Sequence, residues 1–238
     1  MKNTSFLHVA VLFSAFQVAA EPASLQETID AKKAENSAKS SPEKRADYAA
    51  GIEAVAKSRI VETASTVGDV APDFTLTDSK GSAVTLSDEL KKGPVVLTWY
   101  RGGWCPYCNI QLAAYQQILP RIEELGAQLI ALSPELPDKS LSTVEKNQLR
   151  FTVLSDLNLE VAEAYGLVFE LTPEVEKHYA GFFSMKEYNG EEASTRELPL
   201  AATYVIDPNG KIVWSFLDAD YTKRAEPRDI IKALDGIK

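Results

Sequence analysis

Residues 94–109 read Pro94-Val-Val-Leu-Thr-Trp-Tyr-Arg-Gly-Gly-Trp-Cys-Pro-Tyr-Cys-Asn109. The stretch begins with an apolar run, which predicts a central strand buried on both faces. Two glycines then allow the backbone to turn sharply, and the proline that follows suits the first turn of a helix. A buried strand that leads directly into a helix is typical of an α/β domain.

The only two cysteines of the chain, Cys105 and Cys108, lie at this strand-to-helix junction. A bridge across two intervening residues constrains the unfolded chain very little, so the spacing favours redox chemistry over a structural disulfide. Helix N-termini favour thiolate over thiol, so we expect Cys105 to be the first nucleophile. Cys108 lies one helical turn further on, where it can close a disulfide with Cys105.

Four neighbours are candidate supporting residues for this pair. Arg101 is a permanent cation that either stabilises a thiolate or pairs with a carboxylate at the surface. Trp104 either walls off the site or packs, and packing is the preferred interpretation. Pro106 and Tyr107 separate the cysteines, and we expect them to influence the redox potential. We expect no cofactor-binding and no metal-binding residues.

Length and charge limit the class of protein. The chain has 238 residues, of which 45% are hydrophobic, and this favours one main domain with an appendage. Its formal net charge of -9 argues against binding to a phosphate backbone, which normally requires a basic face. We therefore expect no nucleic-acid partner.

The N-terminus predicts a signal peptide over residues 1–20. Lys2 supplies a positive charge, residues 6–16 form an apolar stretch, and the small residues that end at Ala20 suit cleavage. The alternative is a retained anchor, but the apolar stretch is too short to span a bilayer. We expect export to the periplasm or beyond, without stable membrane insertion.

Residues 21–65 form a predicted helical extension. Apolar spacings indicate two amphipathic helices, separated at Ser40-Ser-Pro42. The polar composition favours a solvated helical spacer over a dimerisation or partner-docking segment.

From residue 66 to residue 238, strand patterns alternate with helix patterns, which predicts an α/β domain whose strands are sandwiched by helices. The expected strands cover residues 74–76, 83–85, 95–100, 128–133, 151–154, 203–206 and 212–216, and the expected helices cover 105–126, 142–147, 159–165, 173–182 and 227–237.

Several stretches resemble one known family. Val67-Gly-Asp-Val-Ala-Pro-Asp-Phe-Thr-Leu76, Ser155-Asp-Leu-Asn-Leu-Glu-Val-Ala-Glu-Ala-Tyr-Gly166 and Tyr204-Val-Ile-Asp207 are similar to landmarks of the peroxiredoxin (AhpC/TSA) family of the thioredoxin superfamily. The Cys-Pro-Tyr-Cys stretch resembles a peroxiredoxin-like branch with a glutaredoxin-like active site. The resemblance implies a thioredoxin-like fold, with a central mixed β-sheet sandwiched by helices. The segment Asp218-Ala-Asp-Tyr-Thr-Lys-Arg224 also resembles that branch, with no mechanism attached to it.

The resemblance leaves the roles of the cysteines open. The family pattern is Pro-x-x-x-Thr-x-x-Cys, and alignment on Cys105 places Gly102 at the Thr position and Thr98 at the Pro position. Alignment without a gap instead makes Cys108 the peroxidatic residue. Ala201 falls where the family carries an arginine, and also where thioredoxin-like oxidoreductases carry a cis-proline.

Three functions follow. The first is a thiol-dependent peroxidase that reduces hydroperoxides through a Cys105–Cys108 disulfide. The second is a periplasmic thiol–disulfide oxidoreductase that acts on protein disulfides. Either would take its electrons from a thiol reductant such as a thioredoxin-like protein. The third and least favoured is a copper-binding module that resembles Sco-type folds, with Cys105, Cys108 and His178 as ligands.

Overall fold

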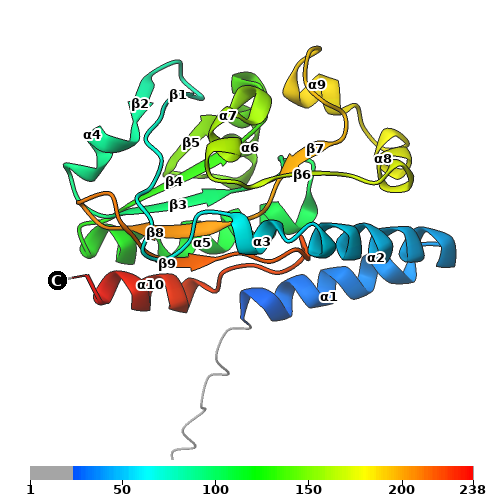
Figure 1. The fold of residues 1–238 in the computed structure, drawn as a ribbon, viewed down its shortest axis with the longest axis horizontal. Helices are drawn as coiled ribbons and strands as arrows, with labels where there is room; N and C mark the ends of the chain where they lie inside the picture. The colour runs from blue at the N-terminus through cyan, green and yellow to red at the C-terminus, as the bar shows by residue number, and fades with distance from the viewer. Residues whose placement is uncertain (1–23, 238) are drawn as a thin grey trace, which may run out of the picture.

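A mixed sheet forms the centre of the computed structural model, which describes residues 24–237 (Figure 1). Its seven strands are β1 (Thr75–Asp78), β2 (Ala83–Thr85), β3 (Val95–Trp99), β4 (Gln128–Ser133), β5 (Thr152–Ser155), β8 (Thr203–Ile206) and β9 (Ile212–Phe216). They lie in the order β2-β1-β5-β4-β3-β8-β9. The β3–β4 and β4–β5 pairs are parallel and the other pairs are antiparallel. The predicted signal peptide, residues 1–20, lies outside the described residues.

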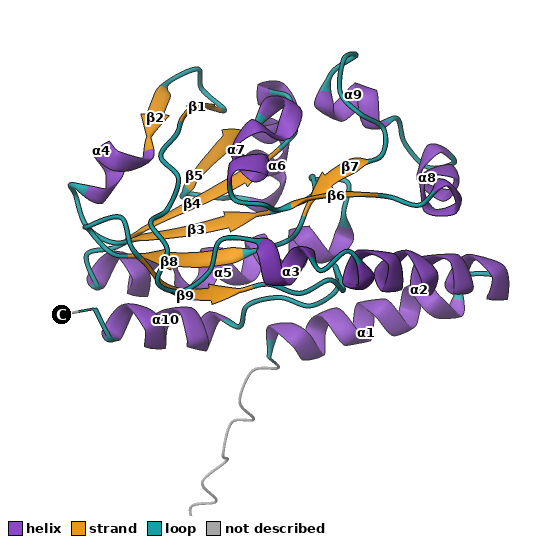
Figure 2. Ribbon diagram, viewed as in Figure 1, coloured by secondary structure: helices purple, strands orange, loops and turns teal. Residues whose placement is uncertain are grey.

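Helices cover the sheet on both sides (Figure 2). They are α1 (Leu25–Ala38), α2 (Pro42–Lys57), α3 (Ile60–Thr63), α4 (Leu86–Leu90), α5 (Pro106–Glu124), α6 (Pro137–Asn147), α7 (Glu160–Ala164), α8 (Pro173–Ala180), α9 (Met185–Asn189) and α10 (Pro227–Asp235), with a 3-10 turn at Leu157–Leu159. A separate small sheet joins β6 (Val168–Glu170) to β7 (Glu197–Pro199). The sequence patterns missed α3, α4, α9, β6 and β7, which are all five residues or shorter.

The side chains of β3 alternate between two hydrophobic layers. Val95, Leu97 and Trp99 point into the layer that α3, α4 and α7 cover. Val96 and Tyr100 belong to the other layer, with residues of α1, α5 and α10. Every residue of β3 is buried, as predicted for a central strand. The predicted α/β class and its mixed central sheet are confirmed.

The N-terminal extension packs on the domain, so its interpretation as a solvated spacer is wrong. Ser24 caps α1 in a reciprocal arrangement with Glu27, and the helix then buries Leu25 and Ile29 in the layer shared with α5 and α10. The helix α2 contacts α8 and buries Val55. Leu25 and Ile29 are four residues apart and therefore lie on one face of α1. The prediction relied on the average composition of the segment, which is polar and does not reveal this apolar face.

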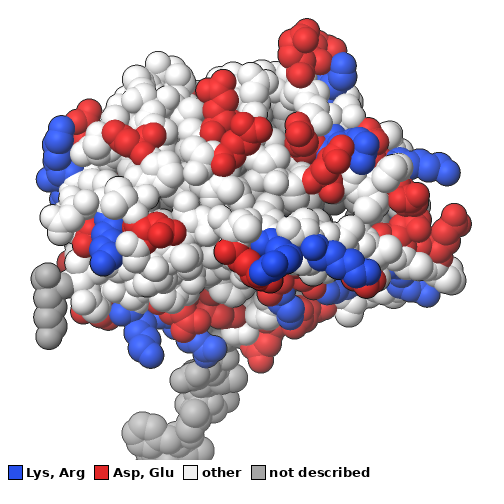
Figure 3. Space-filling view, viewed as in Figure 1, with Lys and Arg blue, Asp and Glu red and all other residues white. Residues whose placement is uncertain are grey.

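Charged side chains of both signs lie interspersed on the face shown in Figure 3. No helix within residues 24–237 has the length and apolar character needed to cross a membrane.

Candidate active site

The junction between β3 and α5 presents both cysteines. Gly102 has φ +147°, and a Cβ there would lie 2.2 Å from the indole nitrogen of Trp104, so this turn requires glycine. Cys105 is the N-cap residue of α5, and Pro106 is its first helical residue. Cys108 lies in the first turn of the helix. The predicted helix start is therefore confirmed.

A buried carboxylate fixes the loop between the strand and the helix. Glu135 accepts hydrogen bonds from the Gly103 N–H at 2.8 Å, the Tyr100 hydroxyl at 3.1 Å and the Thr143 hydroxyl at 3.3 Å. Burial raises the pKa of Glu135, and these hydrogen bonds reduce the rise. Sequence reasoning missed Glu135. The available signal was its position just after β4, because the carboxyl ends of adjacent parallel strands meet at one edge of the sheet.

Both cysteines are free thiols and are almost completely buried, with exposed fractions of 1% for Cys105 and 0% for Cys108. Burial raises the pKa of Cys105. Burial also opposes ionisation of Cys108, but a hydrogen bond from Cys105 and the charges of Arg224 and Arg101 outweigh it, and the pKa of Cys108 falls. The electrostatics thus favour Cys108 as the thiolate. The sequence had predicted the thiolate at Cys105, because Cys105 is the N-cap residue of α5.

The charge next to Cys108 comes from Arg224. Its Nη2 lies 3.5 Å from the Cys108 sulfur, and its Nε donates to Gln111 Oε1 at 2.6 Å. Ala201, the family position for an arginine, is buried and supplies no charge. Sequence reasoning singled out the segment that contains Arg224 but gave it no role, because no local pattern links that segment to the cysteines.

Arg101 is also buried, with 1% of its surface exposed. Its guanidinium carbon lies 5.0 Å, 5.4 Å and 4.3 Å from the ring centroids of Trp104, Tyr179 and Tyr221, and it donates a hydrogen bond to the Tyr179 hydroxyl. None of the carboxylates within residues 24–237 forms an ion pair with it. The interpretation of Arg101 as a surface or carboxylate-paired residue is therefore wrong.

The other predicted supporting residues differ in their contacts. Trp104 stacks on Phe183 with ring centroids 4.4 Å apart, so it packs as preferred. Pro106 is exposed, and the adjacent Tyr107 is buried. The Tyr107 hydroxyl accepts a hydrogen bond from Asn36 of α1 at 3.2 Å, so the N-terminal extension helps to cover the site.

His178 takes part in a different arrangement. Its Nε2 lies 2.7 Å from Asp47 Oδ2, and its ring stacks on Tyr48. In the described part of the chain, no three His, Cys, Asp or Glu side chains are grouped as metal ligands. The copper hypothesis requires His178 to lie with the two cysteines, and the structure does not bring these three residues together.

Comparisons with known sequences identify the family of this chain. The AhpC/TSA family matches residues 67–215. Peroxiredoxin Bcp of Escherichia coli is 29% identical over 151 residues, which cover 63% of this chain and 85% of that protein. The thiol-disulfide oxidoreductase ResA of Bacillus thuringiensis is 25% identical over 148 residues, which cover 62% of this chain and 67% of that protein.

Solved structures support the fold. The crystal structure of peroxidoxin BcpB from Mycobacterium tuberculosis superimposes with a TM-score of 0.57 at 22% identity, covering 73% of this chain and 98% of that one. The helices α1 and α2 and the segment 218–224 lie outside the stretch that the family matches. Since that stretch covers more than half of the chain, with the cysteine pair and all of the central sheet except Phe216, the chain belongs to the AhpC/TSA family.

Proposed function

We propose that this chain is a thiol-dependent peroxidase that reduces hydroperoxides through a disulfide between Cys105 and Cys108. The observation that carries the proposal is a buried pair of free thiols beside two buried arginines, Arg101 and Arg224. Cations that ionise a thiol supply the reactive form for attack on a peroxide. They also stabilise the negative charge that develops on the leaving oxygen.

The reaction balances within the pair. One thiolate attacks the peroxide, so that an S–O bond forms, the O–O bond breaks, and the leaving oxygen takes a proton to give an alcohol or water. The second cysteine then attacks the sulfenic sulfur. An S–S bond forms, the S–O bond breaks, and water leaves. The two sulfurs together lose two electrons, and the peroxide gains them.

A dithiol reductant must restore the pair by thiol–disulfide exchange, and a thioredoxin-like protein has the right chemistry. Such a partner needs direct access to a sulfur, and both sulfurs are covered. We therefore expect the surrounding aromatic side chains to move in the oxidised protein before the reductant reacts.

Stopped-flow mixing of the reduced protein with hydrogen peroxide tests the activity. We expect thiol loss and a change in tryptophan fluorescence at a second-order rate well above that of free cysteine, together with formation of one disulfide per chain. The double variant Cys105→Ser, Cys108→Ser is the control and should not react. A wild-type rate no faster than free cysteine would rule out the peroxidase.

The second candidate is a thiol–disulfide oxidoreductase that acts on protein disulfides. Two observations favour it: the Cys-Pro-Tyr-Cys stretch, and the similarity to an oxidoreductase relative. The burial of both thiols in the reduced protein argues against it, because the reduced pair would itself have to contact a folded protein substrate, whereas the reductant of a peroxidase contacts the oxidised pair. Reduction of insulin disulfides by the reduced protein, measured under the same conditions, separates the two functions.

We also propose that the protein is exported after cleavage behind Ala20. The positive, apolar and small-residue regions of residues 1–20 support this. Expression of the full chain in a bacterium, followed by mass spectrometry of the periplasmic fraction, should find a protein that begins at Glu21. An intact N-terminus in the cytoplasmic fraction would contradict export.

A further inference from the structure

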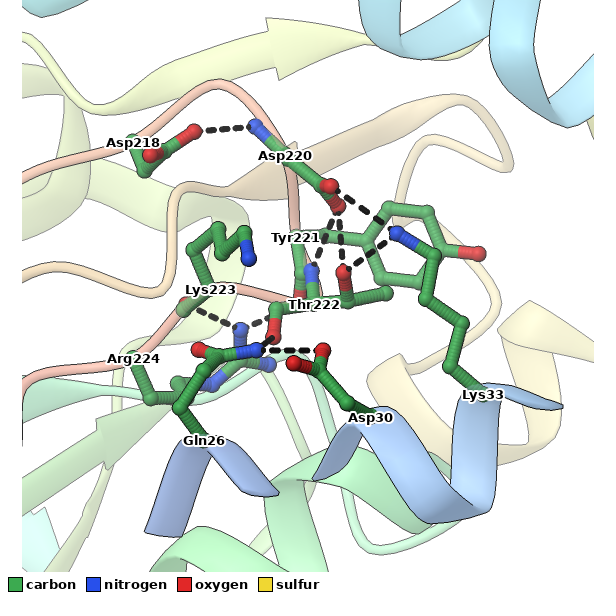
Figure 4. A network of polar contacts seen from close by, with 9 residues as sticks. All are labelled: Gln26, Asp30, Lys33, Asp218, Asp220, Tyr221, Thr222, Lys223 and Arg224. Carbon is green, nitrogen blue, oxygen red and sulfur yellow. Dashed lines mark hydrogen bonds and ion pairs between the residues drawn. The ribbon is translucent and has the colours of Figure 1, made fainter. Parts of the chain in front are cut away.

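The loop 218–224 follows β9 (Figure 4). Its last residue, Arg224, reaches the sulfur of Cys108. Asp218 accepts a hydrogen bond from the Asp220 N–H at 2.7 Å. Asp220 in turn accepts hydrogen bonds from the Thr222 N–H at 2.9 Å and the Thr222 hydroxyl at 2.7 Å. Two successive turns of this kind fix the path of the backbone. The position from which the Arg224 side chain starts is thereby fixed as well.

The N-terminal helix α1 holds this loop from outside. Lys33 Nζ lies 3.1 Å from Asp220 Oδ2 and 3.0 Å from the Thr222 hydroxyl (Figure 4). Gln26 Nε2 donates to the Thr222 carbonyl at 3.3 Å. The helix and the loop both lie outside residues 67–215, the stretch that the family matches. The helix α1 therefore supports the loop on one side of the thiol site.

Each nitrogen of the Arg224 guanidinium has a defined partner. The Nε donates to Gln111, and Nη1 donates to two backbone carbonyls of its own loop. The Nη2 faces the Cys108 sulfur at 3.5 Å. Gln111 in turn donates to the Thr98 hydroxyl at 3.1 Å, which leaves its amide oxygen for Arg224. The guanidinium is held in one orientation, with Nη2 directed at Cys108.

The oxygen partners of Arg224 are all neutral. No carboxylate in the part of the chain that the structure describes forms an ion pair with it, although only 2% of its surface is exposed. A buried cation without an anion is costly, and a thiolate on Cys108 supplies that anion. The Cys105 sulfur receives no arginine hydrogen bond among the described residues.

We propose that Arg224 holds Cys108 as the resting thiolate, so that Cys108 attacks the peroxide and Cys105 resolves the sulfenic acid. Only the second half of this statement rests on the proposed peroxidase function. The assignment reverses the expectation that Cys105, as the N-cap residue, attacks first. It also gives the loop 218–224 and its contacts with α1 a role, which is to position Arg224.

Other ionisable groups face the pair from several elements. Arg101 lies in the β3–α5 turn and adds a second positive charge. Tyr179 of α8 and Tyr221 of the loop surround Arg101. Glu135, after β4, opposes a thiolate when it is ionised. These groups also affect the titration of the cysteines, so the role of Arg224 has to be measured as the difference between the titration midpoints of two variants.

Thiolate absorbance near 240 nm, followed against pH in the reduced protein, tests the proposal without any peroxide. We expect Cys105→Ser to retain a thiolate that forms well below the pH at which free cysteine ionises, and Cys108→Ser to lose it. Arg224→Met should move the midpoint of the remaining thiolate upward by about 1–3 pH units, the usual effect of removing a neighbouring opposite charge. Arg228→Met, an exposed arginine on α10, is the matched control and should leave the midpoint unchanged.

Two further variants keep the test decisive if Arg224→Met folds poorly. Arg224→Lys retains the positive charge but loses the planar guanidinium and its fixed N–H donors. Lys33→Met removes the Lys33 contacts between α1 and the loop 218–224 and changes no residue that contacts the cysteines. Both should raise the midpoint by less than Arg224→Met does. An acidic thiolate that persists in Cys108→Ser, or a midpoint that none of the Arg224 and Lys33 variants moves, overturns the proposal. A failure to consume peroxide with this titration intact overturns the peroxidase function alone.

Discussion

The two sulfurs of the active site come from one turn of α5, whereas the groups that control them come from distant parts of the chain. Arg224 follows β9, Tyr179 belongs to α8 and Asn36 belongs to α1. The local motif therefore supplies the reactive atoms. These distant groups and the elements that carry them, α1, α8 and the loop 218–224, form the shell of the site. The shell decides which sulfur ionises and how far the site is closed to water.

The two regions also differ in their relation to the family. The strand-to-helix junction lies within the stretch that the AhpC/TSA family matches, and α1 and the 218–224 loop lie outside it. The cysteine pair at the junction determines the class of reaction. The shell determines which of the two sulfurs ionises in this chain. Substitutions in the two regions should have different effects.

The largest effect should come from the junction itself. Cys108→Ser should reduce peroxide consumption to background, a loss on the order of 10³-fold or more for removal of a nucleophile. Cys105→Ser should still consume about one equivalent of peroxide and then stop as a sulfenic acid, because no thiol remains to resolve it. Single-turnover peroxide consumption, with mass spectrometry of the trapped sulfenic acid, measures both outcomes. The opposite pattern would assign the first attack to Cys105.

A second effect, on stability, should come from the shell. Ile29→Ala on α1 removes a fully buried side chain and should lower the free energy of unfolding by about 2–5 kcal/mol. Urea denaturation measures the change, and Val70→Ala, at a site that is 76% exposed, is the control. Equal stabilities of Ile29→Ala and the wild type would mean that α1 does not belong to the folded unit.

The buried carboxylate of Glu135 should give a smaller, pH-dependent effect. Its pKa is raised in the folded protein, so its contribution to stability is complete below the ordinary glutamate pKa of about 4.3 and is lost as the pH rises through the raised folded value. Glu135→Gln keeps an acceptor for the Gly103 N–H and cannot ionise.

The unfolding free energy of Glu135→Gln should therefore rise relative to the wild type across this pH window. Denaturation curves at several pH values test this, with the exposed Glu145→Gln as the control. A constant difference between Glu135→Gln and the wild type at all these pH values would contradict the raised pKa.

The smallest effect should come from the start of α1. The Glu226 carboxylate accepts hydrogen bonds from the Leu25 and Gln26 N–H groups at 3.1 Å and 2.8 Å. Glu226→Gln removes a negative charge from this helix N-terminus and should cost about 0.3–1 kcal/mol, less at high salt. Thermal unfolding at low and high ionic strength measures it, with the exposed Glu192→Gln as the control. A salt-independent cost would show that charge is not the cause.

Much of the fold was predictable from the sequence because its signals are local. The buried run of β3, the glycine turn and the helix that begins at Pro106 all follow from residues close together in the chain. The alternation of strands and helices then predicted a sheet between helical layers, and the resemblance to the peroxiredoxin family implied that the sheet is mixed. The short elements α3, α4, α9, β6 and β7 were missed because three to five residues carry too little periodicity to be recognised.

The sequence by itself determined the α/β domain and placed both thiols at a helix N-terminus, because strand burial and helix starts depend on neighbouring residues. Only the tertiary structure decided that α1 packs on the domain, that Arg101 is buried with no carboxylate partner among residues 24–237, and that Arg224 lies against Cys108. The physical reason is distance along the chain: 116 residues separate Arg224 from Cys108, and no local pattern records a contact that the fold creates.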